Sequence, residues 1–319
     1  MGKRMDKEAY FQKVRAEYQK FILDKIKANP EYFGDLETRT AGLMGQQLFV
    51  NPYDFKEGFY NAVQEKDWQS VNDYLFQEMR YWFIPRSQDD ISYDHCSYFM
   101  HVLEAYACGD EQILENAYPY ELGLTTYGYN FYVVGSNLVI AKYYHDEALL
   151  EQAMAAAVKF TGGRASKWER LAIQFLLDVL NKDLESAGET LLNVCKGYSR
   201  VHFFPMMAIE DICIPAHGLY CIAKSWLTDE EFAKITMPKQ KAFLQDYAQW
   251  RIDNPTPILK PYMVYPEDMD IINRIYAVPV VKTMLRMQRE TELSKLRPAK
   301  NDAEMHKVFL AILKQKKGE

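Results

Sequence analysis

Two groups of residues in this 319-residue sequence have types and spacing that a metal site or a nucleophilic cysteine could use. His101 and Glu104 are three residues apart, so on a helix both side chains would lie on one face, with Asp94 or His95 as a further ligand. Their order is the reverse of the Glu-x-x-His pair of helical di-metal proteins, and no second copy follows. A packed or capping histidine is therefore the preferred interpretation, and a metal-dependent helical-bundle enzyme is the alternative.

The second group lies between residues 202 and 221. Its possible ligands are His202, Glu210, Asp211 and His217. Cys213 and Cys221 lie four residues before and after His217, which on a helix would place both thiols on the histidine's face. A nucleophilic cysteine needs a positive environment, but the neighbours here are apolar. We therefore interpret these residues as structural, and both thiols as core residues.

The other signatures of catalysis, secretion or membrane insertion are missing from the sequence. There is no P-loop, Gly-x-Gly-x-x-Gly, Gly-x-Ser-x-Gly or His-Glu-x-x-His. The first residues are charged and lack an apolar leader, and no apolar run reaches the roughly 18 residues of a membrane span. The five cysteines are odd in number and include no Cys-x-x-Cys pair, and we interpret them as buried, reduced thiols. The sequence therefore predicts a cytoplasmic protein that is not an enzyme and has no cofactor or metal.

An acidic, tyrosine-rich segment is the clearest departure from an ordinary composition. Residues 86–158 contain eleven Asp and Glu, ten Tyr, and only Arg86 and Lys142 as cations. Such a charge repels nucleic acid and anionic membranes and attracts basic partners, and Tyr is enriched at protein interfaces. An ordinary solvated face, with the tyrosines in helix packing, is the alternative. The partner contact zone that we expect comprises Asp89, Asp90, Tyr93, Asp94, Glu104, Asp110, Glu111, Glu121, Tyr127 and Tyr129.

Helical periodicity dominates the elements that must position these residues. Tyr10, Val14 and Tyr18 belong to an apolar stripe over 5–28, and no convincing alternating strand is present. Further helices are predicted near 35–49, 54–64, 68–83, 92–108, 111–117, 129–144, 147–159, 165–181, 184–196, 206–227, 229–236, 238–253, 275–290 and 301–316.

A recurrent junction joins these helices in pairs. A short polar turn ends one helix and an aspartate begins the next, at Asp67, Asp110, Asp146, Asp183 and Asp229. These aspartates are 43, 36, 37 and 46 residues apart, too irregular for a tetratricopeptide array. Because a short turn makes neighbouring helices antiparallel and one pair cannot bury both apolar faces, the pairs must stack. We predict an all-α, degenerate αα-repeat, curved or closed into a bundle.

Three segments are expected along the chain. Residues 1–50 form an N-terminal helical extension, 51–253 the αα-repeat core, and 254–319 a C-terminal helical cap, together making one continuous globular unit. The proline-rich stretch 253–261 cannot be helix interior and marks the last boundary.

The arrangement resembles the helical immunity proteins of bacterial toxin systems, in particular the immunity protein 49 family. The resemblance covers about residues 50–250 and is carried by three stretches: Leu103–Asp110, Gly163–Ala172 leading into Leu180–Asp183, and Pro215–Ala223. The chain resembles a related helical family, which neutralises polymorphic nuclease toxins, almost as closely. No catalytic motif is known for either, so no functional residue carries over.

The resemblance implies an antitoxin that binds a cognate toxin and occludes it. Many such toxins are basic nucleases, whose charge an acidic, tyrosine-rich face would complement. The partner expected is therefore a basic toxin protein, not nucleic acid or membrane. A repeat scaffold that binds peptides in a concave groove is another alternative, and the aromatic surface would also suit a homodimer.

Overall fold

The computed structural model describes residues 5–29, 34–88, 93–198, 209–289 and 294–315, and it confirms an all-α architecture. The chain forms two compact units. Unit 1 comprises Met1–Asp90, Ile258–Met284 and Asn301–Glu319, and unit 2 comprises Ile91–Pro257 and Leu285–Lys300. These boundaries differ from the expected ones, because the N-terminal helices, the first αα-pair and the C-terminal helix belong to one unit. No helix within the described residues is both long and apolar enough to traverse a bilayer.

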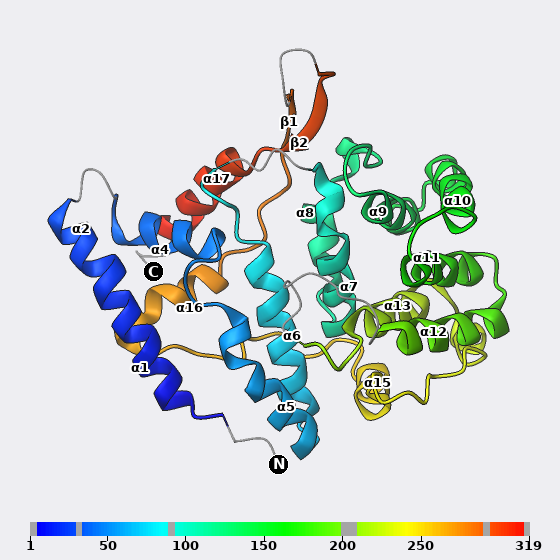
Figure 1. Cartoon of the computed structure of the whole chain (residues 1–319), viewed down its shortest axis with the longest axis horizontal. Helices are drawn as coiled ribbons and strands as arrows, with labels where there is room; N and C mark the ends of the chain where they lie inside the picture. Colours follow the sequence, from blue (N-terminus) through cyan, green and yellow to red (C-terminus); the bar gives the residue numbers. More distant parts are fainter. Residues whose placement is uncertain (1–4, 30–33, 89–92, 199–208, 290–293, 316–319) are drawn as a thin grey trace. The chain divides into compact units, whose positions relative to one another are not determined.

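Unit 1 is built from helices that are distant in the sequence (Figure 1). They are α1 (Lys7–Glu17), a π-helical segment Tyr18–Leu23, α2 (Asp24–Ala28), α4 (Leu36–Gly45), α5 (Lys56–Glu65), α6 (Trp68–Trp82), α16 (Asp270–Tyr276) and α17 (Asp302–Gln315). Helix α16 packs on α4 and α6, and α17 packs on α4. The buried Gln77 of α6 fixes the segment before α16, since its amide accepts from the Met263 N–H at 2.8 Å and donates to the Met263 carbonyl at 3.4 Å.

Unit 2 is a bundle of stacked helix pairs (Figure 1). Its helices are α7 (Phe99–Cys108), α8 (Leu114–Ala117), α9 (Asn130–Tyr143), α10 (Glu147–Thr161), α11 (Lys167–Leu180), α12 (Leu184–Tyr198), α13 (Ile214–Trp226), α14 (Asp229–Phe232) and α15 (Gln245–Asp253). The pairs α9–α10 and α11–α12 pack together, and α13 returns to pack along α7. All ten residues of α7 are buried, so this helix is the centre of the bundle.

The junctions between paired helices share one backbone geometry. The residue before the aspartate has a positive φ of 56°, 87°, 53° and 60° at Lys66, Gly109, His145 and Lys182, respectively. At each junction the aspartate N–H donates to a carbonyl five residues back at 2.9–3.1 Å, which closes the end of the helix. The side chains of Asp67, Asp146 and Asp183 then accept from an N–H three residues ahead, so the predicted caps are confirmed there.

The other two predicted caps differ from the expectation. Asp110 begins a single 3-10 turn, Glu111–Ile113, and its side chain caps no N–H. At the last junction Thr228, not Asp229, is the capping residue, and it forms a reciprocal capping box with Glu231. The hydroxyl of Thr228 already occupies the capping position, so Asp229 lies in the first turn of α14.

Replacing His145 by glycine is expected to raise the stability of unit 2 by about 0.5–1 kcal/mol, because glycine adopts a positive φ without the steric cost of a side chain. His145 is exposed at φ 53°, so little packing is lost. Chemical denaturation measures the change. His145→Ala is the matched control and is expected to give no gain, because alanine keeps the strained conformation. Equal stability of the two variants would contradict the prediction that the positive φ of His145 costs stability.

The prediction near the C-terminus was wrong. Instead of a helix over 275–290, α16 ends at Tyr276 and two antiparallel strands follow, β1 (Leu285–Gln288) and β2 (Arg297–Lys300). Their register pairs Leu285 with Lys300 and Gln288 with Arg297. Pro279 lacks a backbone N–H and the β-branched residues around it favour extended backbone, so the helix cannot continue.

Candidate functional site

Three of the acidic residues expected to contact a partner lie inside unit 2. Asp94, Glu104 and Asp110 expose 1%, 3% and 5% of their surface. The Asp94 carboxylate accepts backbone N–H groups from Cys96, Thr126 and Tyr127 at 2.7–2.9 Å, and thereby ties the 125–128 loop to the start of the bundle. These three residues are therefore structural, and assigning them to an exposed contact zone was wrong.

The histidine–carboxylate pair of the enzyme alternative is buried in α7. His101 Nδ1 lies 3.0 Å from Glu104 Oε2, and both side chains are almost fully covered. His95 points elsewhere, with its Nε2 3.3 Å from the Gly123 carbonyl. Within the described residues no three His, Cys, Asp or Glu side chains are placed to hold a metal ion. The pair is thus an internal contact of the central helix.

The group around His217 is a packed core cluster. His217 Nε2 accepts the Leu244 N–H at 3.1 Å, and its ring stacks on Phe243 with centroids 4.2 Å apart. Burial lowers the pKa of His217 to about 3, and burial raises the pKa of the Cys221 thiol to about 11 and that of Cys213 as well. The histidine is therefore neutral and the thiols are protonated at neutral pH, the opposite of an activated pair. His202 lies outside the described residues.

The remaining residues of the expected contact zone are divided among several places. Asp89 and Asp90 lie outside the described residues. Tyr93, Tyr127 and Tyr129 lie near β2 and α11, whereas Glu111 and Glu121 lie near α8. The structure thus separates the expected zone into two groups of side chains.

The group near α8 is larger than expected and forms what we call the tyrosine–carboxylate surface. It lies where α8, the end of α9 and the start of α10 meet, and it comprises Glu111, Glu115, Tyr120, Glu121, Tyr143, Tyr144 and Asp146. The Tyr144 ring lies between the other two, with centroids 5.1 Å from both Tyr120 and Tyr143. Tyr120 exposes 55% of its surface. A row of three aromatic rings is thus bordered by carboxylates.

The hydrogen bonds of this surface join tyrosines to carboxylates. The Tyr120 hydroxyl donates to Asp146 Oδ2 at 3.1 Å, and the Tyr143 hydroxyl donates to Glu115 Oε1 at 3.4 Å. The bond to Asp146 raises the pKa of Tyr120, while burial and the nearby glutamates raise the pKa of Tyr143 and bring that of Tyr144 to about 12. The pKa of Asp146 is lowered, chiefly by the Leu149 N–H. At neutral pH the surface therefore presents neutral phenols beside the charged carboxylate of Asp146. Burial raises the pKa of Glu111, and the charge of Arg251 acts in the opposite direction.

The second group contains Tyr93, Tyr127, Tyr129 and a tyrosine that was not expected, Tyr132. Tyr129 donates to Glu169 Oε1 at 2.6 Å, which raises the pKa of Tyr129 to about 12. The guanidinium of Arg297, from β2, lies 4.6 Å above the Tyr127 ring. Because a cation of the same chain already covers the aromatic face of Tyr127, this second group is less suited to binding a cation of a partner.

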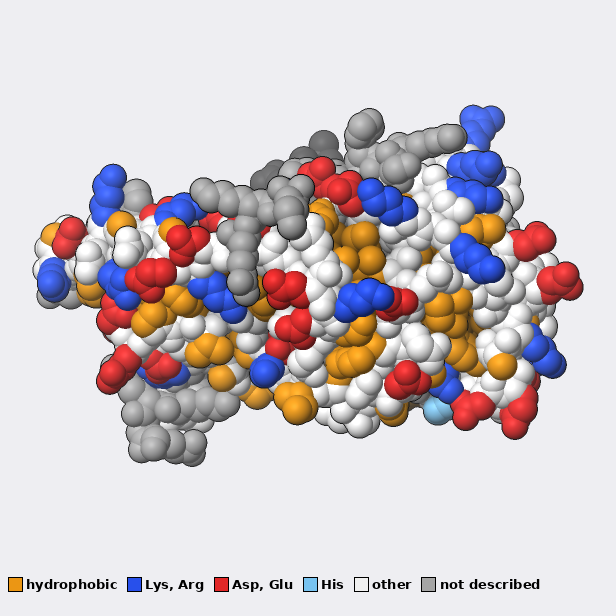
Figure 2. All heavy atoms as spheres, turned by 90° about the horizontal axis from the view of Figure 1, so that it is seen from below, with side chains coloured by type: hydrophobic (Ala, Val, Ile, Leu, Met, Phe, Trp, Pro, Cys, Tyr) orange, Lys and Arg blue, Asp and Glu red, His pale blue; other side chains and the backbone are white. Residues whose placement is uncertain are grey.

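The face drawn in Figure 2 does not show this segregation of charge. On this face, acidic and basic side chains are interspersed with apolar ones. Sequence reasoning did not include Glu115, Tyr120, Tyr143, Tyr144 and Asp146 in the candidate zone, although all lie in the acidic segment. A signal was present, because the two tyrosines directly precede the His145–Asp146 junction, where a helix end must be exposed.

Comparison with known proteins gave a negative result. No family model, no curated protein and no solved structure matches this chain. The resemblance to bacterial immunity proteins therefore stays a prediction.

Proposed function

We propose that this chain is a non-catalytic binding protein that holds a basic protein partner in a stoichiometric complex through the tyrosine–carboxylate surface of unit 2. One observation carries the proposal: within the described residues, Glu115 and Asp146 accept side-chain hydrogen bonds from tyrosine hydroxyls and from no lysine or arginine. A neutral donor leaves the charge of a carboxylate in place, so that charge can attract an external cation.

The aromatic row adds a second mode of recognition. An arginine or lysine of the partner can lie over the face of an exposed tyrosine while pairing with an adjacent carboxylate. Tyrosine also contributes contact area at a small cost in conformational entropy, since it has only two rotatable χ angles. The surface thus offers both apolar area and negative charge, which is the combination that interface cores and rims use.

The partner that we propose is a bacterial toxin of basic, nuclease type, which the chain neutralises by covering its active surface. The acidic character of residues 86–158 and the resemblance to immunity proteins support this assignment. The proposal requires no catalytic residue in this chain, because occlusion alone inhibits the partner. Electrostatic steering would speed the association, as required of an inhibitor that must act before its target does.

The double variant Glu115→Lys/Glu121→Lys is expected to weaken partner binding by at least about tenfold, because it removes two attractive charges and adds two repulsive ones. The partner is first captured from cells that produce the chain with the whole protein as bait. Affinities are then measured by surface plasmon resonance at two salt concentrations. The loss is expected mainly in the association rate and is expected to diminish at high salt.

A matched control carries the same change of charge elsewhere in unit 2. Glu185 and Glu189 are exposed on α12, one helical turn apart, and Glu185→Lys/Glu189→Lys is expected to keep most of the affinity. The proposal is supported by a 1:1 complex with one basic polypeptide whose toxic activity is suppressed on binding. It is contradicted if both double variants bind alike, or if the purified chain forms only a homodimer through this surface.

A further inference from the structure

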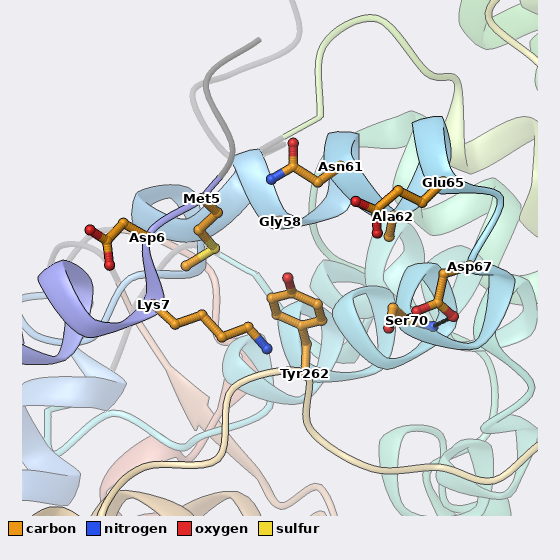
Figure 3. Close-up of a pocket in the computed structure, with 10 residues that line it drawn as sticks. All are labelled: Met5, Asp6, Lys7, Gly58, Asn61, Ala62, Glu65, Asp67, Ser70 and Tyr262. Atoms are coloured by element: carbon orange, nitrogen blue, oxygen red, sulfur yellow. Dashed lines mark hydrogen bonds between the residues drawn. The ribbon is translucent and has the colours of Figure 1, made fainter.

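Unit 1 contains a cavity of about 550 Å³ that belongs to none of the sites considered above. It lies between the start of α1, the α5 helix and the start of α6, and Tyr262 closes one side (Figure 3). The side chains that determine its chemistry are Lys7, Asn61, Glu65, Asp67 and Tyr262. A volume of this size is within the range of ordinary small-molecule sites, roughly 300–1,000 Å³.

The aromatic wall of the cavity is fixed by close packing against α5. A Cβ atom added at Gly58 would lie 2.5 Å from the Tyr262 hydroxyl oxygen, so only glycine permits the phenol to approach this helix. The Tyr262 ring also stacks on Phe55, with centroids 6.3 Å apart and planes inclined by 15°. The ring is thus held in one orientation with a face toward the cavity, as Figure 3 shows.

An ammonium group of the chain itself already occupies this aromatic face. Lys7 Nζ lies 4.2 Å from the centroid of the Tyr262 ring, within the range of a cation–π contact. Burial lowers the pKa of Lys7, while the charges of Asp67 and Asp73 act in the opposite direction. The cavity therefore attracts a primary ammonium through one aromatic face and neighbouring carboxylates.

The arrangement of the carboxylates favours a cation over an anion. Two helices, α1 and α6, begin at the cavity, but each N-terminus is capped by its own aspartate, Asp6 to the Ala9 N–H and Asp67 to the Ser70 N–H. An anion would therefore meet a carboxylate where free N–H groups would be needed. Figure 3 shows Asp6 pointing away from Tyr262 and Glu65 turned toward the cavity.

We propose that this cavity binds a small organic cation with primary ammonium groups on an alkyl chain, a linear diamine or polyamine, and that the Lys7 side chain competes with it. One ammonium of the ligand takes the place of Lys7 Nζ on the Tyr262 ring, and the other pairs with Glu65 or Asp67. This site is independent of the proposed partner surface, because every residue of it belongs to unit 1.

The test is isothermal titration calorimetry of the full chain with 1,5-diaminopentane at low salt. The neutral isostere pentane-1,5-diol and inorganic phosphate are the comparison ligands. The diamine is expected to bind at a 1:1 ratio, and both comparison ligands are expected to give no saturable heat. Saturable binding of the diol with equal affinity, or of phosphate in place of the diamine, would overturn the proposal.

Substitutions of Lys7 and Glu65 are expected to shift the affinity for the diamine in opposite directions. This distinguishes competition by Lys7 from a general loss of structure. Lys7→Ala is expected to tighten diamine binding about fivefold, since it removes an ammonium from the ring and a like charge from the site. Glu65→Gln is expected to weaken binding about fivefold, and Tyr262→Phe to stay within about twofold, because the ring is retained. Glu57→Gln is the matched control on α5, because Glu57 is exposed outside the cavity. Weaker diamine binding by Lys7→Ala, or no binding by any form, would disprove the assignment.

Discussion

Gly218→Ala is expected to destabilise unit 2 by about 2–4 kcal/mol, the largest effect of any single substitution that we predict. Gly218 lies in α13 at its contact with α7. A Cβ atom at this position would lie 2.2 Å from the carbonyl oxygen of Leu103 and 2.7 Å from its carbonyl carbon. Because these are backbone atoms of a fully buried helix, they cannot move aside as a flexible side chain would. The two helices must separate, and the bundle loses packing on both.

The experiment compares two glycines that both lie inside helices. At Gly42 in α4 a Cβ atom would meet nothing within 4 Å, so Gly42→Ala is expected to stabilise unit 1 by up to about 1 kcal/mol through helix propensity alone. Hydrogen exchange measured by mass spectrometry distinguishes the two variants. Faster exchange of α7 and α13 peptides is expected for Gly218→Ala only. Unchanged exchange in these peptides would contradict the close approach of the two helices.

Acidification is expected to destabilise unit 2 through His217. Its pKa is lowered from 6.5 to about 3 in the folded protein, because the ring is buried. Below pH 6.5 the unfolded chain binds a proton at this site and the folded chain does not. Folding stability is therefore full above pH 6.5 and falls as the pH decreases toward 3, by about 1.4 kcal/mol per pH unit. At pH 5 the expected loss is about 2 kcal/mol.

The variant His217→Gln removes this titration but keeps a side-chain acceptor for the Leu244 N–H. It is expected to be less stable than the parent at pH 7.5, because the stacked ring is lost, and to lose less stability between pH 6.5 and pH 5. Chemical denaturation at both pH values, followed by hydrogen exchange in α13, measures the difference. Burial also lowers the pKa of His95, which lies in the same unit, so a residual slope is expected in the variant. Identical slopes in parent and variant would exclude His217 as the source.

The helices and their junctions could be predicted because their signals are local. The aspartate caps at Asp67, Asp146 and Asp183 depend on residues only three or four positions apart. The hairpin was missed for the opposite reason, since β1 is stabilised by pairing with a strand that begins nine residues later. The two units were also missed, because unit 1 joins segments that lie more than 150 residues apart. No local pattern encodes such a contact.

The candidate site could be predicted only in outline. A count of charges located the acidic, tyrosine-rich segment, but composition does not distinguish a buried carboxylate from an exposed one. Glu104 and Asp110 illustrate this, since Glu104 belongs to the fully buried helix α7 and Asp110 lies two residues after its end. The sequence did hold a clue, because residues 99–108 contain no Lys, Arg or Asp and only one Glu among mostly apolar residues, which is typical of a fully buried helix. The contact between the rings of Tyr120 and Tyr144 depends on tertiary structure and had no such clue.

The discontinuous course of the chain has a consequence for the order of events during protein synthesis. Unit 2 is nearly contiguous, whereas α4 and α6 of unit 1 pack against α16 and α17, which the ribosome makes up to 220 residues after the end of α6. At about 5–20 residues per second, the first helices wait roughly 10–40 s for these partners. During that interval the apolar faces that Ala41, Met44 and Met79 bury in the finished protein lie open. The early helices are therefore the part of the nascent chain on which chaperones are expected to act, and the part most prone to aggregation when translation is interrupted.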